Sequence, residues 1–143
     1  MAFQWLQMRI SEEKDRRQRE ALVLERLPAA LDELHANLAE CIRAYTQAFG
    51  PEVAEIRFED SKIRVAVRDR KDDRWDQIAA LEISLIFKPQ GFRVEQTGRE
   101  PMLVEIGLLP AGRLFYRHNE QYLTVEEMTR RILDRALFPK LPE

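Results

Sequence analysis

Few residues of this chain could carry out acid–base or nucleophilic chemistry. It contains two histidines, His35 and His118, and one cysteine, Cys41, among 143 residues. His35 lies at the border of an apolar helical stripe, where half-buried histidines are common. His118 lies in a predicted turn beside Glu120, and turns collect polar residues without any catalytic need. Both histidines are therefore weak candidates for ligand binding, and neither predicts a catalytic centre.

The cysteine and the motif search also argue against an enzyme. Cys41 follows Leu38 by three residues and precedes Tyr45 by four, so we expect its side chain to face the core as a small hydrophobic group. A catalytic thiolate needs an accessible, electropositive site. The glycine-rich phosphate loops, the H-E-x-x-H metal motif and the G-x-S-x-G elbow are all absent. We predict no catalytic residues, no metal and no cofactor.

Arginine is the most unusual feature of the composition, since 18 of the 23 basic residues are arginines. Arg57, Arg64 and Arg68 fall on one face of a predicted hairpin, where guanidinium groups could bind phosphate or carboxylate. Acidic residues such as Glu55 and Glu59 alternate with them and could pair across the strands. The favoured interpretation is a solvated, self-paired surface, and anion or RNA binding is the weaker one.

A second unusual feature is a set of apolar residues on the predicted outer face of the sheet. The alternation places Ile86, Leu103 and Phe115 on this outer face, where a sheet that is buried on one side is expected to carry polar residues. They are either scattered surface hydrophobes or a patch covered by something. The cover would be a second copy of the chain or the N-terminal segment, whose apolar residues include Phe3, Trp5 and Leu6.

Composition limits the class of protein. Hydrophobic residues make up 45% and charged residues 34%, as in globular domains, and the net charge of −2 argues against nucleic acid as a partner. No apolar run is long enough for a membrane span, and the N-terminus lacks the pattern of a signal peptide. One cysteine permits no internal disulfide, which favours a reducing, cytoplasmic location.

The N-terminal third is predicted to be helical. Residues 1–27 form a charged helical arm, with Ser11 as a possible N-cap. Residues 29–49 form a core helix, because apolar residues recur at steps of three and four until Gly50 and Pro51 end the pattern. Pro28 predicts either a kink in one helix or a break between two.

The remainder alternates with a period of two before a last helix. Residues 53–123 are predicted to form an antiparallel meander of about six strands, with tight turns at Asp60–Ser61 and Asn119–Glu120 and a charged loop over residues 70–76. A capping box at Thr124 and Glu127 begins a C-terminal helix over 125–137. The chain, 1–143, therefore reads as one α+β domain with its helices packed on one sheet face.

Two classes of function remain open at this level. The first is a non-enzymatic protein-interaction module that self-associates as a homo-oligomer. The alternative is a cone-like α+β domain or small enzyme that holds a small ligand between helices and sheet. Its weak candidates for contacting the ligand are His35, Tyr45, Trp75, Tyr116 and His118. A core of Leu, Ile, Val and Phe alone would favour the interaction module.

Overall fold

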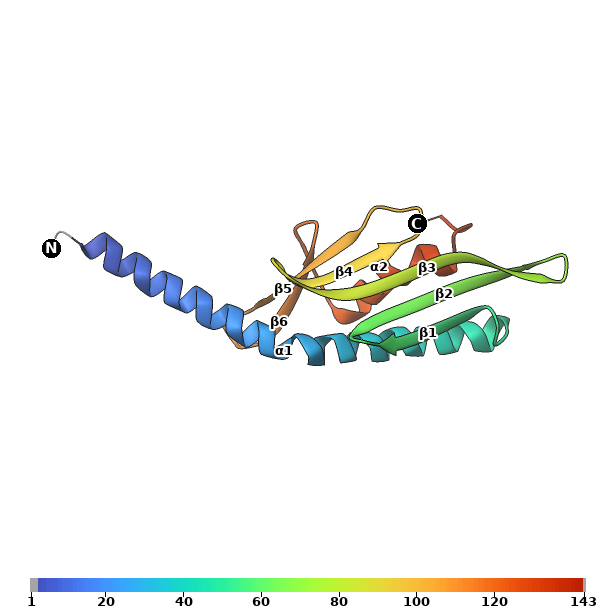
Figure 1. Cartoon of the computed structure of the whole chain (residues 1–143), viewed down its shortest axis with the longest axis horizontal. Helices are drawn as coiled ribbons and strands as arrows, with labels where there is room; N and C mark the ends of the chain where they lie inside the picture. The colour runs from blue at the N-terminus through green and yellow to red at the C-terminus, as the bar shows by residue number, and fades with distance from the viewer. Residues whose placement is uncertain (1–2, 143) are drawn as a thin grey trace.

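A computed structural model describes residues 3–142 and confirms the α+β class with both helices on one face of an antiparallel sheet (Figure 1). A long helix opens the fold, seven strands follow in chain order, and a shorter helix ends it. Their bounds are α1 Gln4–Phe49, β1 Ala54–Glu59, β2 Lys62–Lys71, β3 Arg74–Phe87, β4 Gln90–Gln96, β5 Met102–Leu108, β6 Leu114–His118, β7 Gln121–Leu123 and α2 Val125–Leu137.

Of the two alternatives left open at Pro28, the structure has the single helix. α1 runs without a break from Gln4 through Pro28 to Phe49, so Ser11 is an interior residue and its predicted capping role is wrong. Pro28 cannot donate a backbone hydrogen bond, which costs about 3 kcal/mol inside a helix. Leu27 and Leu31, on either side of it, are fully buried and keep the helix on the sheet. Figure 1 shows the helix axis changing direction in this region, as expected near a proline.

The sheet is a meander in which every strand pairs antiparallel with its neighbours in the sequence, from β1 to β7. The predicted tight turns are present, and both central residues have positive φ at Asp60–Ser61 and Asn119–Glu120. The charged loop predicted over residues 70–76 is wrong. β2 and β3 continue through it and turn at Asp72–Asp73, again with positive φ at both residues. Aspartate tolerates this conformation, which explains how a charged segment makes a two-residue turn.

The core lies between one face of the sheet and the two helices. α1 packs on β1, β3, β4, β5 and α2, and α2 also packs on β3 and β7. Thr129 is the only polar side chain buried among the described residues, and its hydroxyl donates to the Val125 carbonyl oxygen at 2.8 Å. The core is otherwise apolar, and its largest fully buried side chains are Phe92, Leu27, Leu31, Leu34, Leu38, Ile63, Ile83 and Met128.

The beginning of α2 is fixed by the predicted capping box. The Thr124 hydroxyl oxygen accepts from the Glu127 amide at 3.1 Å, and a Glu127 carboxylate oxygen accepts from the Thr124 amide at 3.3 Å. These bonds satisfy amides that the helix itself leaves unpaired. The helix then lays Met128, Ile132 and Leu133 on the sheet.

Candidate functional site

The N-terminal part of α1 stands clear of the rest of the molecule. No residue from 3 to 22 is buried, and the helix extends away from the sheet (Figure 1). We call residues 3–19 the arm. The next residue, Glu20, is hydrogen-bonded to the sheet, because Gln90 Nε2 donates to its carbonyl oxygen at 2.8 Å. Val23 and Leu27, which the prediction gave to the arm, are buried in the core.

The arm combines exposed apolar side chains with self-paired charges. Its exposed large hydrophobic residues are Phe3, Trp5, Leu6, Met8 and Ile10. Glu13 pairs with Arg16 at 2.6 Å and with Arg17 at 3.1 Å. Hydrogen bonds from these two arginines lower the pKa of the Glu13 carboxyl to about 2. Ion pairs three and four residues apart support the helix where no tertiary contact does.

The outer face of the sheet carries the other predicted interaction residues. Leu103 is 46% exposed, while Ile86 and Phe115 are half-buried. The Phe115 ring lies over Gly107, where an added Cβ would come within 2.2 Å of it, and packs edge-on against the Tyr122 ring at 5.3 Å. The arm points away from this face, so it does not cover these residues within one chain (Figure 1).

The hairpin arginines are paired with carboxylates. Arg64 lies 3.1 Å from Glu82, and Arg68 lies 3.0 Å from Glu55, which Arg57 also approaches at 3.7 Å. All three pairs are at least partly exposed, so they contribute little to stability. Their pairing favours the self-neutralised surface over an anion or RNA site on this hairpin.

The five candidates for ligand binding do not meet in one pocket. Tyr116 is buried and stacks on Phe92 with a centroid separation of 6.2 Å, and burial raises the pKa of its hydroxyl. His35 is half-buried with its ring 4.8 Å from that of Phe58. Both therefore serve packing in this structure.

Tyr45 and Trp75 are brought together at one cavity. It has a volume of about 680 Å³ and lies between the end of α1, the β2–β3 hairpin and the C-terminal segment. The Tyr45 hydroxyl donates to the Leu137 carbonyl oxygen at 3.2 Å, which ties α1 to α2, and burial raises its pKa. The hydroxyl thus already has a partner within the protein.

Cys41 does not face the core as predicted. Its side chain is exposed and lines the groove between α1 and α2. The buried stripe of α1 continues from Leu38 to Ile42. Cys41, three residues after Leu38, lies beyond the edge of this stripe. Partial desolvation and the neighbouring Glu40 carboxylate raise the pKa of the thiol, which opposes thiolate formation.

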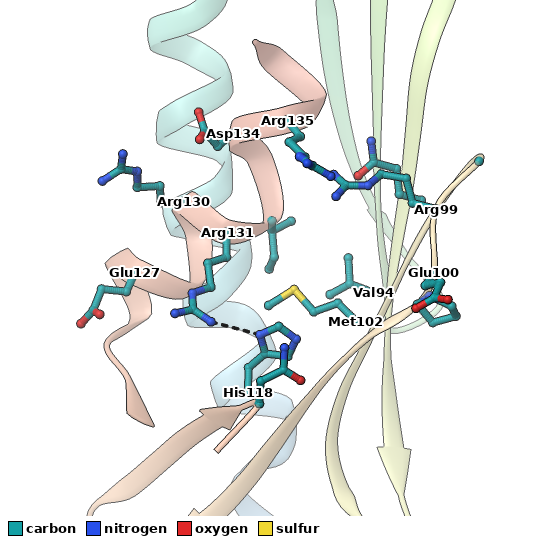
Figure 2. A pocket seen from close by; sticks show the side chains of 15 residues that line it. Val94, Arg99, Glu100, Met102, His118, Glu127, Arg130, Arg131, Asp134 and Arg135 are labelled. Atoms are coloured by element: carbon teal, nitrogen blue, oxygen red, sulfur yellow. Dashed lines mark hydrogen bonds between the residues drawn. The ribbon is translucent and has the colours of Figure 1, made fainter. Parts of the chain in front are cut away.

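His118 lies in a different environment from the other candidates. It lines a cavity of about 900 Å³ between α2, the β4–β5 loop and the β6–β7 turn (Figure 2). Arg131 Nη1 is 3.2 Å from His118 Nδ1, and Arg131 Nη2 also donates to Gln121 Oε1. Burial and the Arg131 charge lower the pKa of His118.

The sequence reasoning missed the arginines of this cavity. Arg99, Arg130, Arg131 and Arg135 all line it. Arg131 and Arg135 are spaced by four residues and lie outside the apolar stripe of α2, which was an available signal. Their convergence with Arg99 depends on the β4–β5 loop, whose position follows from the sheet register and not from local sequence.

Comparison with known proteins gives no family for this chain, since no family model, curated protein or solved structure matches it. Within residues 3–142, no helix has the length and apolar character needed to cross a membrane. The same residues contain no cluster of three or more His, Cys, Asp or Glu side chains that could hold a metal ion.

Proposed function

We propose that this protein is a non-enzymatic interaction module that self-associates through its arm. The observation that carries the proposal is the exposure of five large apolar side chains on a helix with no tertiary cover, Phe3 and Trp5 being 66% exposed and Met8 60%. Exposed apolar clusters of this kind mark interaction sites in soluble proteins. A second copy of the chain carries the same exposed apolar side chains, so two arms can bury these side chains against each other.

The composition of the core supports this function over a ligand-binding cone. The space between helices and sheet is filled with leucine, isoleucine, valine and phenylalanine side chains, and Thr129 is the one buried polar residue among those described. A specific ligand pocket needs a few placed polar groups inside it. The Thr129 hydroxyl is already bonded to the backbone, so the space beneath the helices holds few polar groups, chiefly the hydroxyl of the buried Tyr116.

The spacing of the arm residues suggests how two copies would pair. Phe3, Ile10, Arg17 and Leu24 repeat every seven residues, and Leu6, Glu13 and Glu20 form the companion series. In an antiparallel pairing that sets Leu6 against Leu24 of a second copy, Glu13 faces Arg17 of that copy. In this register Ile10 lies against Glu20, Leu6–Leu24 is the apolar pair and Glu13–Arg17 is the ion pair that defines the register.

The first test compares the mass of the full chain with that of a variant lacking residues 1–19, by native mass spectrometry or light scattering. The cut leaves Glu20 and the buried Val23 in place. We expect an oligomer for the full chain and a folded monomer for the variant. An unchanged mass on truncation would contradict the arm as the interface and would direct attention to the outer sheet face.

Point variants test the register. Leu6→Glu with Ile10→Glu should give a monomer, whereas Ser11→Glu with Gln18→Glu, on another side of the helix, should leave the oligomer intact. Glu13→Arg alone should weaken association through like charges, and adding Arg17→Glu should restore it. Association that Glu13→Arg leaves unchanged would contradict a contact between Glu13 of one copy and Arg17 of the other.

We also propose that the module works in a reducing, cytoplasmic compartment and does not bind nucleic acid. The single cysteine and the net charge of −2 support this, together with the pairing of the hairpin arginines.

A further inference from the structure

The cavity at His118 has an apolar floor and a cationic wall (Figure 2). Val94 and Ile132, which are almost fully buried, form the floor together with Met102. Arg131 extends from α2 toward His118, and Arg135 extends from the same helix toward Arg99 of the β4–β5 loop (Figure 2). Three guanidinium groups from two elements therefore border one space of about 900 Å³.

Arg99 and Arg131 differ from the arginines on the outer sheet face. Arg64, Arg93 and Arg117 each pair with a glutamate at 2.5 to 3.1 Å. Within residues 3–142, neither Arg99 nor Arg131 forms an ion pair with a carboxylate, and both recorded partners of Arg131 are neutral groups. Neither guanidinium is therefore directly paired with a carboxylate of the protein.

Three acidic residues also line the cavity, and within residues 3–142 none of them forms an ion pair with Arg99 or Arg131. Glu127 lies one helical turn before Arg131, yet its carboxylate is engaged by the Thr124 amide in the capping box. Figure 2 shows Glu127 and Asp134 directed away from Arg99 and His118. Asp134 also lines the neighbouring groove between α1 and α2. Glu100 is the remaining acid, in the same loop as Arg99.

The hydrogen bond from Arg131 determines the tautomer of the neutral His118 ring. Because a guanidinium only donates, His118 Nδ1 must accept the bond from Arg131, which places the proton of the neutral ring on Nε2. His118 Nε2 is then a donor. Arg131 has five N–H donors, and Gln121 and His118 account for two of them. The cavity thus offers preoriented donors that are not all used within the protein.

We propose that this cavity binds a small organic oxyanion, a carboxylate or a phosphate monoester attached to a compact apolar group. The oxyanion lies between Arg99 and Arg131 and accepts from them. The apolar group lies against Val94, Met102 and Ile132. This proposal does not depend on self-association through the arm, which is on a different part of the molecule.

The test follows the imidazole signals of the two histidines by NMR in the full-length protein. Phenyl phosphate is added in one titration and benzoate in a parallel one. Binding should perturb the His118 signals, identified by their loss in His118→Gln, and leave those of His35 unchanged. It should also raise the His118 pKa, since an anion beside the ring favours its charged form. Benzyl alcohol, the neutral analogue, should cause no shift.

Variants assign the binding to the arginines. Arg99→Gln and Arg131→Gln should each weaken binding at least tenfold, while Arg93→Gln, which removes an arginine paired with Glu95 on the outer face, should not. Arg99 lies in an exposed loop, so its variant tests the site even if Arg131→Gln disturbs folding. Binding of phenyl phosphate alone would identify a phosphate site, and binding of both anions a general oxyanion site. Absence of any His118 shift, or affinity unaffected by Arg99→Gln, would overturn the proposal.

Discussion

The arginines of the outer sheet face and those of the cavity at His118 differ in the side chains that they contact. Residue type alone does not distinguish them. On the outer face, Arg117 meets Glu105 across neighbouring strands and the charges cancel. At the cavity, Arg131 meets the neutral His118 and Gln121, and its charge stays available. Glu127, one helical turn before Arg131, instead accepts from the Thr124 amide in the capping box.

His118 makes stability depend on pH. Burial and Arg131 lower its pKa in the folded state, with Arg99, Glu100, Glu127, Arg130, Asp134 and Arg135 as the other charges lining its cavity. The unfolded chain then binds more protons below the ordinary value of 6.5, so the stabilisation present above that pH is lost as the pH falls.

We therefore expect the free energy of unfolding of the wild type to fall faster than that of His118→Gln between about pH 7 and pH 5, by at most about 1.4 kcal/mol per pH unit. Urea unfolding at several pH values measures both curves, and the difference removes the contribution of carboxyl groups common to the two proteins. Arg131→Gln should reduce the effect, since it removes one cause of the lowered pKa. Parallel curves for wild type and His118→Gln would contradict the expectation.

At the scale of elements, local patterns predicted most of the fold. The alternation along β1 to β6 and the capping box of α2 are encoded in adjacent residues, and both are confirmed. Where local preference left alternatives open or was wrong, distant contacts decided the structure. Burial of Leu27 and Leu31 carries α1 through Pro28, and pairing of β2 with β3 extends both strands into a charged segment. The cavity at His118 was not predictable, because it joins α2 to a loop from the middle of the sheet.

The capping box is the local signal whose energy can be tested directly. Thr124→Ala removes the oxygen that accepts from the Glu127 amide and should destabilise the protein by about 1 kcal/mol. Thr124→Ser keeps an acceptor at the same position and should cost much less. Chemical denaturation of the three proteins measures the difference. Equal losses for alanine and serine would show that the methyl group of the threonine matters more than its hydroxyl.

At the scale of the whole molecule, exposed apolar surface is divided between two places, the arm and the outer sheet face. The arm projects from the body and makes no core contact before Val23, so removing it should leave the packing of helices on the sheet unchanged (Figure 1). The outer face has Leu103 and Tyr122 exposed beside the Arg117–Glu105 pair. If copies associate through the arm, stability depends on protein concentration only while the arm is present.

Thermal unfolding over a range of protein concentrations separates these two surfaces. Association of the folded state stabilises it by mass action, so the melting temperature of the full chain should rise with concentration, by about 2 °C for each tenfold increase if unfolding is coupled to dissociation of a dimer. The variant lacking residues 1–19 should melt at one temperature throughout the range. A variant that keeps the concentration dependence would place the interface on the sheet, where Leu103→Glu should then abolish it. If neither protein shows the dependence, and both have the mass of a monomer, self-association through the arm is wrong.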